Sequence, residues 1–344
     1  MRSSEGGESH RKAIAKLVSI GKACGLISRE TWVPSIYTGA DVKPDDAYAP
    51  FIDVIWLLDL QRVLSGSYAE YRKLMTRLTS NQGIRRLCED DFRLIPMAAF
   101  EVVTHDATSK IVATDILNMI AGHAPFAFEI VREFKGGMNV SRAERIAKTS
   151  QFFEGWRNIF VVSYDMLMNL TPKEVPVSCA VKWKRFSEAI VGAKVSEEET
   201  QIRHRLFELA RTCGLKAVFE YSPMEVFRSI DKKELQQPRF DAVFFLEIPR
   251  QASSTLRRLT SISKMPVLRD FCHLPLLAFE TERRTGGKHS VGGIVNLARY
   301  ATFGFSVTST LKLEARLQRA VNLYSHAHGF NNVFVCSNDV LDKI

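Results

Sequence analysis

The sequence predicts an α/β protein made of two tandem domains, each a mixed β-sheet flanked by helices. The main observation is an internal repeat, in which residues 91–101 (DFRLIPMAAFE) return as residues 270–280 (DFCHLPLLAFE). Asp, Phe, Pro, Ala, Phe and Glu occupy the same places in both copies without a gap. A second observation is the length of 344 residues, which suits about two domains that each bury a core.

Two shorter blocks flank this repeat in the same order along both halves of the chain. Residues 23–26 (ACGL) correspond to 212–215 (TCGL), and residues 155–165 correspond to 329–339. The copies are offset by 174 to 189 residues. This offset is far longer than the roughly 20 to 50 residues of a solenoid repeat, so the pattern predicts a duplicated domain.

The boundaries of the two domains follow from the repeat. We expect a first domain at residues 10–170 and a second domain at residues 196–344. Residues 171–195 contain two prolines and several lysines, a composition typical of a connecting segment. We therefore expect this segment to be the linker, with a short helix near residues 183–191.

Each domain is predicted to open with an amphipathic helix followed by a glycine. Apolar residues at helical spacing mark the buried face of the helix in both copies, and the glycine suits a helix C-cap. These residues are Ile14, Leu17, Val18, Cys24 and Gly25 in the first copy, and Leu206, Leu209, Ala210, Cys213 and Gly214 in the second. The two cysteines lie at equivalent places near the ends of the helices, and we expect buried free thiols there.

The remaining elements of each copy alternate strands and helices. A buried strand is followed by a basic helical insert, a long strand ending in Ala-Phe-Glu, a helix, and two further strands separated by a helix. The segments that define them are 51–58, 68–87, 111–119 and 159–163 in the first copy, and 240–246, 254–263, 291–297 and 333–337 in the second. This order predicts a mixed sheet flanked by helices in each domain.

The net charge of +9 is unevenly distributed along the chain. Residues 1–170 carry a net +1, residues 171–195 a net +3 and residues 196–344 a net +5. A basic surface favours polyanions such as nucleic acid, because contacts with phosphates release condensed counterions. No stretch reaches the roughly 18 apolar residues of a membrane span, and no secretion signal is recognised. We therefore expect a cytoplasmic protein without membrane contact.

Acidic residues interrupt or end the predicted apolar strands at equivalent places in the two copies. Asp53 and Asp241 lie inside apolar runs, and Glu101 and Glu280 end the long strands that follow. A carboxylate in a buried strand is costly unless it is paired, protonated or bound to a metal. Alternation along the strand adds Glu282 to the second set, and such hard oxygen ligands suit Mg²⁺ or Mn²⁺.

Plainer interpretations of these polar residues stay open at the level of sequence. The two aspartates have an alternative role as solvent-facing or ion-paired strand residues. The two glutamates have an alternative role as caps of the helices that follow, since an acid is stabilised near a helix N-terminus. Asn118 and Asn296 lie among apolar helix residues, where they either bond to a polar site or satisfy a core amide.

With these acids in this order, the chain resembles the PD-(D/E)XK nuclease superfamily, which has the restriction-endonuclease-like fold. The resemblance rests on the element order helix-strand-strand-strand-helix-strand. It also rests on a short motif, an Asp on one strand and then an acid, any residue and a Lys on the next. Asp241 and Glu280 match the two acids, and Glu282 stands where Lys is usual. Lys288 lies eight residues beyond Glu280 and is a candidate for the missing cation.

The resemblance implies two restriction-endonuclease-like domains that form an internal pseudo-dimer. It also implies a Mg²⁺- or Mn²⁺-dependent endonuclease of the restriction, defence or mobile-element type, with double-stranded DNA as substrate. Asp241, Glu280 and Glu282 are then the expected metal ligands. Lys288 is then expected to offset negative charge that develops in the transition state.

The first copy keeps only part of this pattern. Asp53 and Glu101 are expected metal ligands there, and Lys110 corresponds to Lys288. Val103, however, stands where the second copy has Glu282. We therefore expect a weakened first site, cleavage mainly at the second site, and double-strand breaks only when two chains act together.

The alternative function is a nuclease-derived scaffold that binds nucleic acid or a protein partner without cutting. Val103 and the missing Glu-x-Lys favour this alternative, whereas the intact acidic set of the second copy favours the enzyme. A homodimer and a protein partner in a larger system stay open, as do the recognition sequence and the choice between DNA and RNA.

Overall fold

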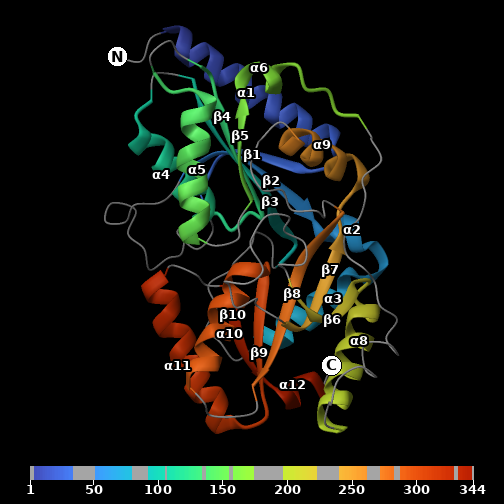
Figure 1. The fold of residues 1–344 in the computed structure, drawn as a ribbon. Coiled ribbons are helices and arrows are strands. Elements are labelled where there is room, and N and C mark those ends of the chain that lie inside the picture. The colour runs from blue at the N-terminus through green and yellow to red at the C-terminus, as the bar shows by residue number, and fades with distance from the viewer. Residues whose placement is uncertain are drawn as a thin grey trace. The chain divides into compact units, whose positions relative to one another are not determined.

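A computed structural model of the chain describes residues 4–33, 51–79, 92–104, 107–133, 137–154, 158–173, 197–222, 240–261, 272–282, 287–328 and 332–342. These residues form a mixed α/β protein with two five-stranded mixed sheets flanked by helices (Figure 1). The predicted fold class is confirmed at this level. The expected linker, apart from residues 171–173, lies outside the described residues.

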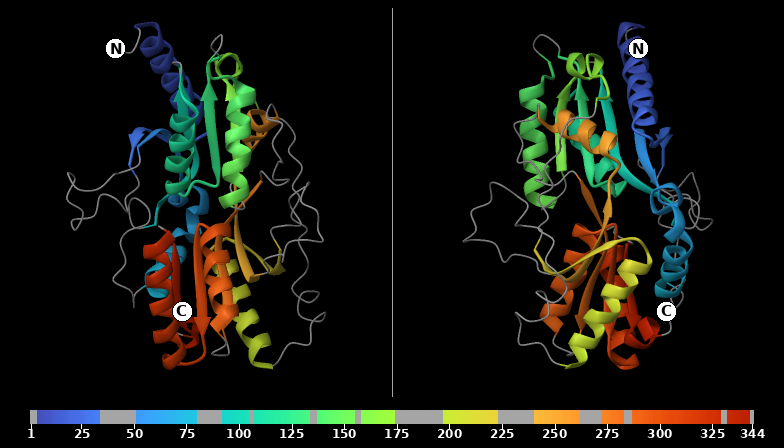
Figure 2. Two further views of the ribbon diagram at one scale, coloured as in Figure 1. Left: turned by 60° about the vertical axis from the view of Figure 1, so that its left-hand side comes forward. Right: turned by 90° about the vertical axis from the view of Figure 1, so that its right-hand side faces the viewer.

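The first half of the sequence contains one complete sheet. Its elements are α1 (Ser4–Ala23), β1 (Ile27–Trp32), β2 (Ile52–Asp59), α2 (Leu60–Leu64), η2 (Ser65–Ser67), α3 (Tyr68–Thr79), β3 (Leu94–Val103), α4 (Ser109–Ala121), β4 (Phe126–Val131), α5 (Val140–Glu154), β5 (Asn158–Ser163) and α6 (Tyr164–Met168). The strands lie in the order β1-β2-β3-β4-β5. Figure 2 shows this sheet between α1 on one side and α5 on the other.

The second half of the sequence repeats this arrangement. Its elements are α8 (Glu197–Thr212), β6 (Lys216–Tyr221), β7 (Phe240–Glu247), α9 (Arg250–Ser261), β8 (His273–Glu282), α10 (Gly287–Tyr300), β9 (Phe303–Thr308), α11 (Leu311–His328), β10 (Val333–Ser337) and α12 (Asn338–Asp342). In each sheet the first three strands are antiparallel and the last three are parallel. The two sheets therefore have the same topology.

An equivalent row of packed aromatic rings crosses each sheet. The ring centroids of Trp56, Phe100, Phe128 and Phe160 lie 4.4, 5.0 and 5.4 Å apart across β2 to β5. Those of Phe244, Phe279, Phe305 and Phe334 lie 4.7, 5.3 and 5.4 Å apart across β7 to β10. All eight side chains are fully buried, so equivalent residues of the two halves build equivalent cores.

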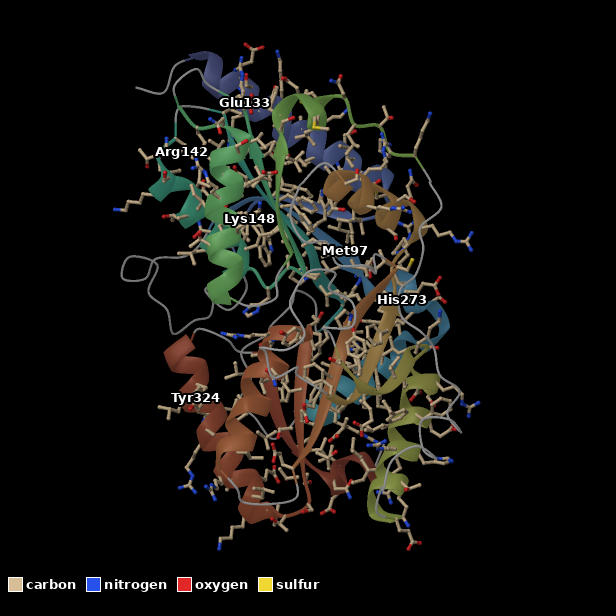
Figure 3. All side chains as sticks on the ribbon, in the orientation of Figure 1. Met97, Glu133, Arg142, Lys148, His273 and Tyr324 are labelled. Carbon is tan, nitrogen blue, oxygen red and sulfur yellow. The ribbon has the colours of Figure 1, made fainter. Side chains whose placement is uncertain are left out.

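The same β-bulge accompanies this row in both sheets. The register between β2 and β3 shifts so that Met97, shown in Figure 3, is an extra residue opposite Trp56 and Leu57. The register between β7 and β8 shifts in the same way at Leu276. A bulge bends and twists a strand locally and is rarely retained by chance, which supports the duplication.

We expect Phe128→Ala and Phe305→Ala each to lower the free energy of unfolding by about 3–5 kcal/mol, because each removes a buried ring from the middle of its row. Urea unfolding measures the effect. Phe51→Ala is the control, since Phe51 is 57% exposed and the change should stay within about 0.5 kcal/mol. A loss below about 1 kcal/mol for both core variants would contradict the packing described here.

The compact units of the structure do not follow the two halves of the sequence continuously. One unit comprises Met1–Asp59, Cys88–Ser178 and Ile248–Cys272, and the other comprises Leu60–Leu87, Cys179–Glu247 and His273–Ile344. The helix α9 therefore belongs to the unit of the first sheet, and α2 and α3 belong to the unit of the second sheet. The continuous segments expected from the sequence do not include this reciprocal exchange.

Contacts inside each unit fix the exchanged helices at equivalent places. In the first unit the Cys24 thiol donates to Thr255 Oγ1 on α9 at 3.2 Å. In the second unit Gly214 has a positive φ of 69° and lies so close to Ser67 that a Cβ there would stand 3.1 Å from the hydroxyl oxygen. Cys24 and Cys213 are buried free thiols, as predicted, and burial raises the pKa of Cys213 to about 12.

Two further observations concern the chain as a whole. Cys272 is disulfide-bonded, which the scattered cysteine spacing does not predict. A search of the described helices finds none with the length and hydropathy needed to cross a bilayer.

Candidate acidic sites on the two sheets

The carboxyl groups of Asp241 and Glu280 share one face of the second sheet. Ala242 pairs with Phe279 in the antiparallel ladder of β7 and β8, and the register continued by one residue sets Asp241 opposite Glu280. Directly opposite residues of an antiparallel pair have their side chains on the same face. Asp241 Oδ2 also accepts a hydrogen bond of 2.7 Å from the backbone N–H of Thr281. The sequence prediction that these two acids converge is consistent with this geometry.

Glu280 lies among other acids. Burial, and then the charges of Asp241, Glu282 and Glu220, raise the pKa of Glu280 to about 9, so its carboxyl group holds a proton at neutral pH. Glu220, one of these acids, forms an ion pair with Arg203. A carboxyl group in such surroundings is neutralised either by a proton or by a cation that enters the site.

Glu282 is the third acid of the set and lies two residues beyond Glu280 on the same face of β8. A Cβ atom added to Gly293 would lie 3.4 Å from Glu282 Oε1. The Glu282 carboxylate therefore lies against α10, where that helix covers the sheet. Asp241, Glu280 and Glu282 are all half-buried, which leaves each of them partly accessible to solvent.

The first sheet repeats the same pair of acids with the same backbone anchor. Asp53 Oδ2 accepts a hydrogen bond of 2.9 Å from the N–H of Val102, the residue after Glu101, as Asp241 does from the residue after Glu280. His10 Nε2 on α1 lies 3.0 Å from Asp53 Oδ2. Glu101 is only 6% exposed. Burial, and then Asp53, Asp115 and Glu129, raise its pKa well above the ordinary value.

Two acids near this pair, Glu129 and Asp115, are absent from the sites expected from the sequence. Glu129 pairs in register with Glu101 across the parallel ladder of β3 and β4 and is completely buried. Neither of its carboxyl oxygens has a hydrogen-bond partner, and Glu101 Oε1 has none either. Burial, and then Asp53, raise the pKa of Asp115 on α4 to about 7.

The helix-cap interpretation of the two glutamates is wrong in this structure. Glu101 lies inside β3, and the N-cap of α4 is Thr108, whose side chain accepts a hydrogen bond from the N–H of Ile111. Glu280 lies inside β8, well before α10 begins at Gly287. Asn118, in contrast, donates to the backbone oxygen of Phe51 at 3.4 Å. It therefore attaches α4 to the start of β2.

The two lysines of the predicted sites are less well defined. Lys110 is exposed in the first turn of α4. Lys288 belongs to the first turn of α10, but its side chain lies outside the described residues, as do Arg283 and Arg284. The structure therefore sets Asp53 opposite Glu101 and Asp241 opposite Glu280, and the role of the lysines stays a prediction.

The donor chemistry of both clusters fits a hard divalent cation, because every candidate ligand is a carboxylate oxygen. Glu129 and Glu101 Oε1 also lack hydrogen-bond partners, and a bound cation would neutralise Glu280 in place of its proton. In the described part of the chain, no three His, Cys, Asp or Glu side chains are arranged to hold a metal ion as they stand. Binding therefore requires the carboxyl groups to turn toward one another.

Comparisons with known proteins do not identify this chain. No protein-family model matches it, and neither a curated protein nor a solved structure does. The acidic clusters therefore have to be interpreted from their own chemistry.

Proposed function

We propose that the chain is a metal-dependent endonuclease that hydrolyses phosphodiester bonds in double-stranded DNA at the Asp241, Glu280 and Glu282 cluster. One observation carries this proposal. In both sheets an Asp and a Glu face each other on neighbouring strands, and the Asp accepts the N–H that follows the Glu. Carboxyl groups on neighbouring strands of a sheet cost free energy unless they are paired, protonated or bound to a metal, and a cation site gives the pair of acids a use in both copies.

The order of the elements supports the same proposal. When the helices between the second and third strands are omitted, each half has the order helix, strand, strand, strand, helix, strand up to its fourth strand. This is the order that the resemblance to the PD-(D/E)XK superfamily implies, with the acids on the second and third strands. Under this proposal the two copies form an internal pseudo-dimer. The net charge of +9 favours a polyanionic substrate.

The residues of the second cluster have separate parts in this chemistry. A divalent cation bound by Asp241, Glu280 and Glu282 supplies positive charge beside a phosphate and acidifies water. Asp241 is held in place by the Thr281 N–H and so presents its carboxylate at a fixed position. Glu280 would have to lose its proton before its carboxylate could hold the cation. Glu282, against α10, orients the attacking water, and Lys288 offsets charge on the phosphate.

The second cluster suits a large substrate better than the first. Asp241, Glu280 and Glu282 are all half-buried, whereas Glu101 is 6% exposed and Glu129 is not exposed at all. A phosphate on a DNA strand has to approach the acids directly. We therefore assign hydrolysis to the second sheet, as Val103 already suggested from the sequence.

The alternative function, a scaffold that binds DNA or a protein partner without cutting, keeps one observation in its favour. The described residues contain no preformed set of three metal ligands. A scaffold of this kind retains the acids only as remnants of an ancestral site, and it leaves DNA intact whatever cation is added.

The test is the conversion of supercoiled plasmid by the purified chain in the presence of Mg²⁺ or Mn²⁺. We expect open circles to accumulate before linear product, because one active site cuts one strand. EDTA should stop the reaction completely. Binding of plasmid in a gel-shift experiment without cleavage under either cation would favour the scaffold.

A further inference from the structure

The two sheets differ by a reciprocal exchange of one carboxylate between a strand and a helix. The strand position of Glu282 in the second sheet is occupied by Val103 in the first. Helices α4 and α10 begin at Ser109 and Gly287. Aligned from these first residues, Asp115 of α4 corresponds to Gly293 of α10. The second sheet thus has a strand acid and a helix glycine, and the first sheet has a strand valine and a helix acid.

The helix position in question faces the acidic cluster in the second sheet. A side chain at Gly293 would begin 3.4 Å from the Glu282 carboxylate. In the first sheet, Asp115 follows the buried Val112 by three residues and precedes the buried Met119 by four, which places it on the covered stripe of α4. This helix packs against β2, β3 and β4, the strands of the cluster.

Unpartnered carboxyl oxygens lie beside Asp115 in the first sheet. Glu129 is completely buried and has no hydrogen bond at either oxygen, and Glu101 has none at Oε1. The two acids are register partners on neighbouring parallel strands, so both point to the face that carries Asp53. Buried polar atoms normally have a partner. Three unsatisfied carboxyl oxygens on the face that carries Asp53 therefore point to a cation, which the acids would bind after turning toward one another.

We propose that the first sheet holds a second divalent-cation site, with Asp53, Glu101 and Asp115 as its ligands and Glu129 beside them. The helix carboxylate of Asp115 takes the part that the strand carboxylate of Glu282 has in the second sheet. The inference rests on the proposed function only for the choice of Mg²⁺ or Mn²⁺ as the ion. Because Glu101 and Glu129 are more deeply buried than the acids of the second cluster, its ion stabilises the fold rather than reaching a DNA phosphate.

The test counts bound Mn²⁺ on the full chain without DNA, from the loss of the free-ion signal in electron paramagnetic resonance. We expect one ion on each sheet in the wild type. Asp115→Asn should remove one ion and Glu280→Gln the other, each by lowering the affinity at least 10-fold. Asp165→Asn is the matched control, since Asp165 is exposed on α6. Circular dichroism on every variant shows that the fold is kept.

The outcomes separate this inference from the proposed function. A single ion, lost in Glu280→Gln and kept in Asp115→Asn, overturns the first site and leaves the proposed function standing. A single ion lost only in Asp115→Asn supports the first site and removes the metal from the proposed nuclease. No bound ion in the wild type overturns both.

A second pair of variants tests the exchange in the half-buried cluster, where a change of side chain is easier to accommodate. Glu282→Val should remove the ion of the second sheet. Glu282→Val combined with Gly293→Asp should restore it, because the double variant copies the arrangement of the first sheet. If the double variant binds Mn²⁺ no better than Glu282→Val, the helix carboxylate does not replace the strand carboxylate, and the equivalence is wrong.

Discussion

We expect Glu280→Ala to abolish the proposed Mg²⁺-dependent nicking of supercoiled plasmid, and Glu101→Ala to leave most of it. We expect the rate to fall at least about 100-fold for Glu280→Ala, in line with the loss of a group that stabilises charge in a transition state. Glu280 is half-buried beside two other half-buried acids, so its carboxylate can reach a cation and a phosphate together. Glu101 is 6% exposed and should contribute to stability instead. Gel densitometry of open and closed circles measures both rates.

Glu247→Ala is the control for this comparison. Glu247 ends β7 in the same sheet, and its exposed side chain pairs with Lys216, so nicking should stay at the wild-type rate. Equal loss of activity in Glu280→Ala and Glu101→Ala, or direct linearisation by the monomer, would show that the first sheet is catalytic as well. Full activity in Glu280→Ala would remove the second cluster from the mechanism.

Without divalent cations, we expect Glu280→Gln to make the protein more stable at pH 8 and to flatten the pH dependence of its stability. The pKa of Glu280 is about 9 in the folded chain, against its ordinary value of 4.5. Between these two values the unfolded chain has released this proton and the folded chain has kept it. Stability is therefore fully present below pH 4.5 and falls as the pH rises toward 9. We expect Glu280→Gln to gain about 1–3 kcal/mol at pH 8, the usual cost of an uncompensated buried group.

The charged groups around Glu280 make this effect specific. Asp241, Glu282 and Glu220 all act on it in the same direction, and Arg203 is engaged with Glu220. Urea unfolding in EDTA at pH 5 and at pH 8 measures the difference, with Glu247→Gln as the exposed control. Saturating Mg²⁺ should reverse the order of stability at pH 8, since only the wild type keeps its full ligand set. The assignment would be contradicted if the stability of the wild type and that of Glu280→Gln changed by the same amount between pH 5 and pH 8.

Much of the fold is predictable from the sequence, because the repeat supplies two independent readings of each element. The strands at 51–58 and 240–246 are apolar runs of strand length, and they appear as β2 and β7 with bounds shifted by at most a residue. The exchange of α2, α3 and α9 between the compact units is not predictable in this way. The exchanged helices follow equivalent strands, so either helix suits either sheet by pattern alone.

The acids of the site were predictable to different degrees. Asp53 and Asp241 each interrupt an apolar strand, and the repeat doubles that signal. Glu129 likewise interrupts an apolar strand, FAFEIV. The equivalent position in the second sheet, opposite Glu280, is Ser306, so the repeat gives no second acid to support the prediction. Asp115 gives no signal of its own, because a polar residue in an amphipathic helix is ordinary. Only the packing of α4 on the sheet reveals its part.

The most direct test of the proposed function is anomalous scattering from Mn²⁺ in crystals of the chain, measured near the manganese absorption edge. We predict a peak bounded by the carboxylates of Asp241, Glu280 and Glu282, and its loss in crystals of Glu280→Ala. Manganese bound only at other surface carboxylates, with Glu280 still protonated and without a metal contact, would contradict the assignment of hydrolysis to this cluster.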